Sequence, residues 1–163
     1  MEIVLAEVKD APIIHEVMLQ AFKEYEHAIP PSSALNETVA SIEQALKCGE
    51  RAFIGYIKEQ AVAMVRLFTV NNTGIYFFRL SVIPEKQGLG LAKALIVGLE
   101  KYGRSQRKSI SECKVRMSVP RNIELYHSLG YVITKEEVVK NRNGIAIPVV
   151  TMVKVLSEEG DIT

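Results

Sequence analysis

The residues that could do chemistry lie between an apolar run, Ile75–Ile83, and a helical pattern that begins near Leu91. The connecting segment contains Gly88 and Gly90. Glycine adopts backbone conformations that other residues avoid, and it lets a ligand approach the backbone closely. The first amides of the following helix have no partner within that helix, so they favour an anion. This order of strand, glycine loop and helix predicts a site for an anionic group such as a pyrophosphate.

Two well-known phosphate-binding motifs do not fit this segment. The Walker A motif requires Gly-Lys-Ser/Thr after four residues, whereas Gly88 is followed by Leu-Gly-Leu-Ala-Lys-Ala. The dinucleotide fingerprint Gly-x-Gly-x-x-Gly fails because Lys93 occupies the position of its third glycine, in mid-chain after an antiparallel region. The loop therefore predicts neither a P-loop nucleotide hydrolase nor a nicotinamide-dependent enzyme.

The other reactive side chains form no recognisable motif. The histidines and cysteines lack the spacing of metal ligands, so we expect no bound metal; they are His15, His27, His127, Cys48 and Cys113. We expect His15 to be structural or solvent-exposed. Cys113 alternates with apolar residues along a strand-like run, which predicts a place in the core.

Hydrophobic periodicity predicts an α/β (α+β) domain with the element order βααβββαβαββ. Asp10 and Asn36 each precede a helical pattern and can cap it. About seven strands should form a mixed, mostly antiparallel sheet with helices on both faces. Pro148 weakens the last strand and predicts an edge position or a bulge there. The expected strands are Ile3–Val8, Ala52–Lys58, Ala61–Asn71, Ile75–Ile83, Glu112–Val119, Tyr131–Val139 and Ile145–Leu156.

Length and charge agree with one ordinary globular domain. The chain has 163 residues and a net charge of +1, and we expect a single domain over residues 1–156 with a flexible tail at 157–163. The small net charge gives no broad attraction for nucleic acid or an anionic membrane, and we expect neither as a partner. We see no secretion signal or membrane-spanning run, and no Cys-x-x-Cys, so we expect a cytoplasmic location.

The glycine loop resembles the acetyl-coenzyme A (acetyl-CoA) loop of the GNAT superfamily of N-acetyltransferases. The family pattern Gln/Arg-x-x-Gly-x-Gly/Ala matches Gln87–Ala92. A second block, Asn122–Tyr131, is similar to the family's downstream helix, which ends in Leu-Tyr-x-x-x-Gly-Phe/Tyr. The inferred order of elements extends the resemblance over about residues 2–156. One departure is Val119, which stands where many members carry an asparagine.

The resemblance implies a site for acetyl-CoA as co-substrate. Leu80 and Val82 would pair with its pantetheine arm through their backbone. The pyrophosphate would lie on the loop, held by the amides of Leu89–Ala92 with a contribution from Gln87. The residues expected to bind acetyl-CoA are Leu80, Val82, Gln87, Gly88, Leu89, Gly90, Leu91, Ala92 and Asn122. For Asn122, capping or bracing its helix is the alternative.

The resemblance also implies two catalytic groups. The Val82 amide would polarise the thioester carbonyl, and the Tyr126 hydroxyl would donate a hydrogen bond or proton to the leaving thiolate. The alternative for Tyr126 is a residue packed at a helix edge with a wet hydroxyl. Glu24, Glu26 and His27 follow the first helical pattern, but a solvated helix end explains them better than a general base does. We therefore name no base.

The implied function is an acyltransferase, an N-acetyltransferase that uses acetyl-CoA. The acceptor would be a primary amine of a small molecule or a peptide. No Gly-x-Ser-x-Gly motif occurs and neither cysteine stands in a nucleophile context, which favours direct attack in a ternary complex. The alternatives are a noncatalytic acyl-CoA-binding regulatory module and an interaction domain without a nucleotide. The resemblance leaves open a homodimer through the C-terminal hairpin.

Overall fold

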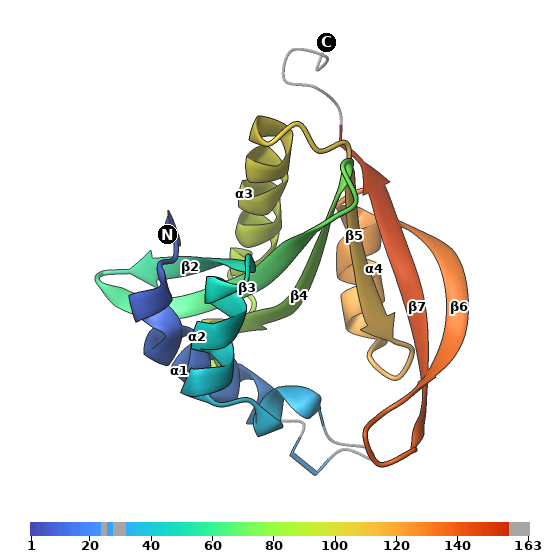
Figure 1. Cartoon of the computed structure of the whole chain (residues 1–163), viewed down its shortest axis with the longest axis horizontal. Coiled ribbons are helices and arrows are strands. Elements are labelled where there is room, and N and C mark those ends of the chain that lie inside the picture. The colour runs from blue at the N-terminus through green and yellow to red at the C-terminus, as the bar shows by residue number, and fades with distance from the viewer. Residues whose placement is uncertain (24–25, 28–31, 157–163) are drawn as a thin grey trace. The chain divides into compact units, whose positions relative to one another are not determined.

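The computed structural model describes residues 1–23, 26–27 and 32–156 (Figure 1). The predicted flexible tail at 157–163 and Glu24 lie outside these ranges. Contacts between residues divide the chain into two compact units. The first consists of Met1–Phe68 and Phe77–Leu99, and the second of Thr69–Tyr76 and the chain from Glu100 onward. The expectation of a single domain over residues 1–156 stays a prediction.

The first unit is built on antiparallel strands and two helices that lie side by side (Figure 1). Strand β1 pairs with β2, β2 pairs with β3, and β4 is the next strand in the order. Helix α1 turns one apolar face inward, with Ile14 and Met18 fully buried four residues apart. Its elements are β1 (Glu2–Leu5), α1 (Ala11–Phe22), α2 (Val39–Lys47), β2 (Arg51–Ile57), and most of β3 (Gln60–Val70) and of β4 (Gly74–Val82), whose residues Thr69–Tyr76 belong to the second unit.

Helix α2 begins at a different cap from the expected one. The N-cap is Thr38, whose hydroxyl accepts a hydrogen bond from the Ser41 amide at 3.0 Å, while the Ser41 hydroxyl accepts one from the Thr38 amide at 3.0 Å. This reciprocal pair satisfies a free amide of the first turn. Asn36 instead ends a short 3₁₀ turn, Ser33–Asn36, so its predicted capping role is wrong.

The second unit contains β5 (Ile110–Arg116), α4 (Pro120–Ser128), β6 (Val132–Lys140) and β7 (Ala146–Val155). Its strands follow the order β5-β7-β6, and the first residues of β4, Gly74–Tyr76, belong to this unit as well. The β4–β5 pair is parallel and joins Gly74–Tyr76 to Ile110–Glu112, whereas β7 runs antiparallel to both neighbours. Helix α4 lies against β5 (Figure 1).

Strand β7 is not at the edge of the sheet, contrary to the expectation from Pro148. It lies between β5 and β6. The ladder with β5 begins at Val149, opposite Arg116, so the missing amide of Pro148 lies just outside it. The edge strand on this side is β6.

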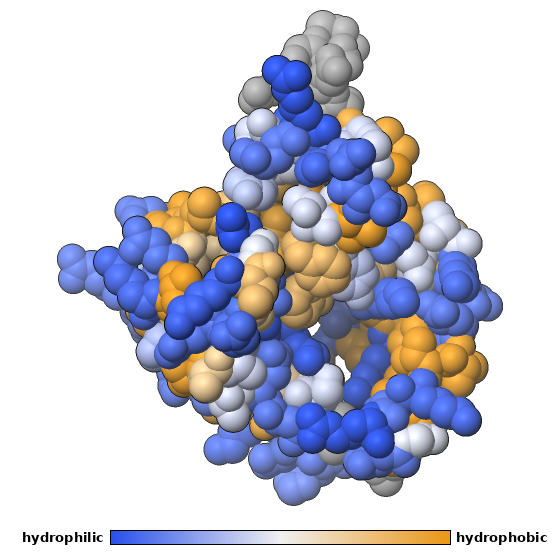
Figure 2. Space-filling view, in the orientation of Figure 1, coloured by the Kyte–Doolittle hydropathy of each residue, from blue (hydrophilic) through white to orange (hydrophobic). Residues whose placement is uncertain are grey.

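The predicted order of elements is confirmed. Asp10 is the N-cap residue of α1, but its side chain accepts from the Glu7 amide and does not cap the helix, so that predicted role is wrong. The described residues form four α-helices, with α3 at Leu91–Ser105, and a seven-stranded, mostly antiparallel sheet. Hydrophobic residues on the face viewed in Figure 2 stand in small groups among hydrophilic ones. Within the described ranges, no helix is both long and apolar enough to span a lipid bilayer.

Candidate functional site

The glycine loop leaves the end of β4 through a short, well-anchored turn. The Ile83 amide donates to the Val62 carbonyl at 2.9 Å, which holds the strand end against β3. One 3₁₀ turn follows at Pro84–Lys86. The Gln87 side chain then reaches back, and its Nε2 donates to the Val82 carbonyl at 3.2 Å. The structure therefore joins Val82 and Gln87, two of the predicted site residues, through a direct hydrogen bond.

Gly88 and Gly90 both require a left-handed backbone. Their φ angles are +80° and +79°, a region in which side chains with a Cβ are strained. Nothing lies within 4 Å of the place where a Cβ would stand on either residue, and both residues are exposed. The loop thus presents bare backbone to open space, which is the arrangement that a close-lying ligand needs.

Helix α3 supplies donors next to these glycines. Its first intrahelical bond runs from the Ala94 amide to the Gly90 carbonyl at 3.2 Å. Helix geometry leaves the amides of Leu91, Ala92 and Lys93 without a partner inside the helix. The partial positive charge of a helix N-terminus adds to these donors. The exposed loop and the start of α3 therefore fit a pyrophosphate, as the sequence predicts.

The end of β4 carries the two predicted site residues that lie on a strand. Leu80 and Val82 are half-buried, and the intervening Ser81 is buried. The Ser81 hydroxyl donates to the Arg79 carbonyl at 2.8 Å. Arg79 itself has a φ of +56°, so Leu80–Val82 follows directly on a left-handed residue inside the strand.

Asn122 and Tyr126 lie on α4 in the second unit, so the structure groups them apart from the loop residues. Tyr126 is 6% exposed, and its ring meets Tyr131 edge-on with 6.0 Å between ring centroids. The Tyr126 carbonyl also accepts the Tyr131 amide at 3.0 Å. Asn122 is the third residue of α4, whose N-cap is Val119, so Asn122 does not cap the helix.

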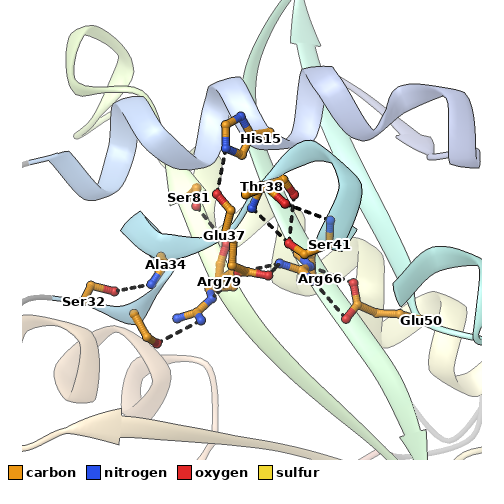
Figure 3. Close-up of polar contacts among 11 residues, drawn as sticks. His15, Ser32, Ala34, Glu37, Thr38, Ser41, Glu50, Arg66, Arg79 and Ser81 are labelled. Atoms are coloured by element: carbon orange, nitrogen blue, oxygen red, sulfur yellow. Dashed lines mark hydrogen bonds and ion pairs between the residues drawn. The ribbon is translucent and has the colours of Figure 1, made fainter. Parts of the chain in front are cut away.

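An ion network in the first unit was missed by the sequence analysis (Figure 3). Arg66, on β3, is buried and donates to Glu50 at 2.7 and 3.1 Å and to both carboxylate oxygens of Glu37 at 2.8 Å. Arg79 donates to the same Glu37 at 3.0 Å. Burial acts to lower the pKa of Arg66, but the hydrogen bonds to Glu50 and Glu37 outweigh it and leave the pKa raised. The signal for this network that the sequence offered was Arg66, a single arginine within an apolar run.

A second buried cluster lies in the other unit and is fully hydrogen-bonded. Tyr131 donates to Glu100 at 2.8 Å, and Ser111 lies 2.7 Å from the Tyr131 hydroxyl. Lys154 donates to the other carboxylate oxygen of Glu100 at 3.0 Å. Burial, chiefly, raises the pKa of Tyr131. Each group has its partner in the core, which is typical of a structural network.

Two of the histidines, His15 and His27, make side-chain contacts with residues other than those of the loop. His15 Nε2 lies 3.0 Å from the Glu37 carbonyl, a contact between α1 and the segment before α2, so the expected structural role is confirmed. His27 and Glu26 form an exposed pair with 3.3 Å between Nε2 and Oε1. Among the described residues, no group of three or more His, Cys, Asp or Glu is arranged to hold a metal ion.

The two cysteines differ in environment, which predicts unequal reactivity. Cys113 is 2% exposed, and burial raises its pKa, whereas Cys48 is exposed. Since the thiolate is the reactive form and burial shields the sulfur from a reagent, Cys113 should react with a disulfide reagent far more slowly than Cys48. We expect one rapidly reacting thiol in the native protein and two in denaturant. Cys48→Ser should remove the rapid phase, and a persisting rapid phase would contradict the burial of Cys113.

Solved structures of similar fold include three acetyltransferases. The ribosomal-protein-S18-alanine N-acetyltransferase of Escherichia coli has a TM-score of 0.77 and 20% identity, covering 99% of this chain and 97% of that one. A putative acetyltransferase of Salmonella typhimurium, solved with its cofactor acetyl-CoA, has a TM-score of 0.71 and 20% identity, with coverages of 98% and 96%. An aminoglycoside 6'-N-acetyltransferase complexed with coenzyme A (CoA) has a TM-score of 0.72 and 15% identity, with coverages of 99% and 100%. At these identities the likeness shows the fold.

The sequence itself shows the family. A comparison with curated protein sequences gives no match. The family model described as Acetyltransferase (GNAT) family matches residues 14–131, which is more than half of the chain. The matched range includes both the glycine loop and Tyr126. The resemblance seen in the sequence is confirmed, and this chain belongs to the GNAT acetyltransferase family.

Proposed function

We propose that this protein is an acetyl-CoA-dependent N-acetyltransferase whose acceptor is a primary amine of a small molecule or a peptide. The observation that carries the proposal is the loop at the start of α3, where two left-handed glycines leave bare backbone open to a ligand. Family membership supports acetyl transfer. Two structures of the same fold that were solved with acetyl-CoA or CoA support the choice of donor.

In this proposal the loop binds the pyrophosphate and β4 binds the pantetheine arm. The amides of Leu89–Ala92 donate to the phosphate oxygens. The Gln87 side chain already donates to the Val82 carbonyl, so we assign it to holding the loop against the strand end. Leu80 and Val82 offer backbone groups to the arm. Binding at the loop is thereby coupled to the position of the strand that lies along the acyl group.

Acetyl-CoA supplies a thioester whose carbonyl carbon can accept an amine. The Val82 amide donates to the carbonyl oxygen and stabilises the negative charge that develops there. The amine nitrogen forms the new bond to the carbonyl carbon as the carbon–sulfur bond breaks. The Tyr126 hydroxyl donates a proton or hydrogen bond to the departing sulfur. We route the amine proton to water.

The carboxylates of the ion network are unsuited to serve as the base. Glu37 and Glu50 each accept hydrogen bonds from the buried guanidinium of Arg66. Both carboxylates are therefore engaged in holding a buried cation rather than open to an acceptor amine. Glu26 and His27 pair with each other at the surface. We therefore assign no general base among these four residues.

The decisive experiment combines a binding measurement with an acceptor screen. We expect CoA to raise the melting temperature of the protein and acetyl-CoA to be consumed when a suitable amine is present, with the acetylated amine identified by mass spectrometry. Binding without transfer to any amine in a broad panel would support the noncatalytic acyl-CoA-binding module instead. Absence of CoA binding would refute both functions.

Tyr126→Phe should lower kcat by about 10- to 100-fold, below the upper range for general acids because a thiolate is already a fair leaving group. The Kd of CoA should stay within about twofold, since the lost hydroxyl acts on the departing sulfur. Steady-state kinetics and calorimetry separate the two effects. Tyr102→Phe, the same change on α3, is the matched control and should leave kcat unaltered. Wild-type kcat in Tyr126→Phe would remove the assigned contact with sulfur.

A further inference from the structure

Phe78 and Arg79 are consecutive residues of β4, yet both contact the ion network: Phe78 contacts Arg66, and Arg79 contacts Glu37. The Phe78 ring centroid lies 4.9 Å from the Arg66 guanidinium carbon. Arg79 Nε donates to Glu37 at 3.0 Å, and that carboxylate accepts from Arg66 at 2.8 Å. In a regular strand, successive side chains point to opposite faces. Two neighbouring side chains of β4 therefore both contact one network.

The backbone of Arg79 is unusual for a residue inside a strand. Its φ of +56° lies in the left-handed region, which is unfavourable for a residue with a Cβ such as arginine. Four other described residues besides glycine have a positive φ, and each of these lies in a turn between elements: Lys58, Glu59, Asn71 and Arg107. Arg79 is the one such residue within a strand of the described chain. Surrounding contacts must hold it there.

Those contacts come from the ion network (Figure 3). Glu37 is its centre, since its carboxylate accepts from both Arg66 and Arg79. Arg79 Nη2 donates to the Ser33 hydroxyl at 3.0 Å. The backbone carbonyl of Arg79 accepts a hydrogen bond from the Ser81 hydroxyl at 2.8 Å. The Arg66 side chain is 3% exposed, so this anchor is rigidly packed. Arg79 is thus held at its side chain and at its carbonyl.

The segment that follows Arg79 is Leu80–Val82, to which the proposed function assigns the pantetheine arm and the thioester carbonyl. A left-handed residue immediately before this segment changes the direction in which its backbone groups point. We infer that Arg79 is a positioning residue of the acyl-transfer site: anchored through Glu37 to Arg66, it sets the direction of the Leu80–Val82 backbone groups. This inference rests on the proposed function.

The test measures amide hydrogen exchange, with CoA as the probe, in wild type, Arg79→Gln and Arg79→Lys. In wild type, CoA should slow exchange at least about tenfold in two peptides, one covering residues 80–83 and one covering 87–93. Arg79→Gln keeps the Cβ but removes the cation, so CoA should protect the loop peptide and no longer the strand peptide. Arg79→Lys, which restores a point charge near Glu37, should give intermediate protection of the strand.

Glu59→Gln is the matched control, because Glu59 also has a left-handed backbone but lies in the β2–β3 turn. It should keep wild-type protection at both peptides. Wild-type strand protection in Arg79→Gln would overturn the positioning role while leaving the proposed function intact. Failure of CoA to protect either peptide in wild type would refute the proposed function, and the inference with it. If Arg79→Gln unfolds, Arg79→Lys tests the positioning role instead. An equal loss of CoA protection at both peptides in Arg79→Lys would refute a local role of Arg79.

Discussion

Gly90→Asp should weaken CoA binding at least about 100-fold, while the domain stays folded. The added carboxylate would stand where the first amides of α3 face the diphosphate. Two unit charges 4 Å apart repel by about 4 kcal/mol at an effective dielectric constant of 20, and each 1.4 kcal/mol changes Kd tenfold. The Cβ itself has room, since nothing lies within 4 Å of it, but the φ of +79° strains any residue other than glycine.

Two further variants separate charge from strain. Gly90→Ala carries the strain without the charge, so its loss of affinity should be about tenfold or less. Gly144→Asp adds the same side chain at an almost identical backbone, with a φ of +77° and nothing within 4 Å, but in the turn between β6 and β7. Its Kd for CoA should match wild type. Calorimetry at fixed ionic strength gives all three values, and wild-type affinity in a folded Gly90→Asp protein would refute the loop assignment.

Arg66→Met should lower the free energy of unfolding by about 3–5 kcal/mol, the usual cost of removing one partner of a buried ion pair. Methionine fills much of the space of the arginine stem, so the loss comes from the charges left behind. The side chains of Glu37 and Glu50 are only 20% and 11% exposed and would lose their shared cation. The contact of the guanidinium with Phe78 would be lost as well.

Urea denaturation of wild type and Arg66→Met measures this difference directly, and the melting temperature should fall by about 6–20 °C for a domain of this size. Arg51→Met is the control, since the Arg51 side chain is exposed and donates to the neighbouring Glu50 carbonyl. Arg51→Met should lower the free energy of unfolding by less than about 0.5 kcal/mol. In a Glu50→Gln background, Arg66→Met should lower the free energy of unfolding by less than it does in the wild-type protein, because the two residues are coupled. Equal stability of Arg66→Met and wild type would show that the network contributes nothing to the fold.

The glycine loop was predictable because its chemistry is local. Gly88 and Gly90 lie within four residues of the helix whose amides they expose, and such short-range patterns depend little on the rest of the chain. The order of strands and helices was predictable for the same reason, since apolar periodicity reports which face of each element is buried. The cap of α2 was mispredicted because Asn36 and Thr38 are both good caps, and the reciprocal bonds with Ser41 decide between them.

What this sequence determined by itself is the set of elements and the glycine turn before α3, each encoded by residues close together in the chain. The tertiary structure alone decided that Arg66 meets Glu50 and Glu37, which are 16 and 29 residues away, and that Arg79 reaches Glu37 across 42 residues. It also gave Arg79 its left-handed backbone within a strand. A pairing over such separations depends on how strands and helices pack, and any acidic residue along the chain satisfies the local pattern equally well.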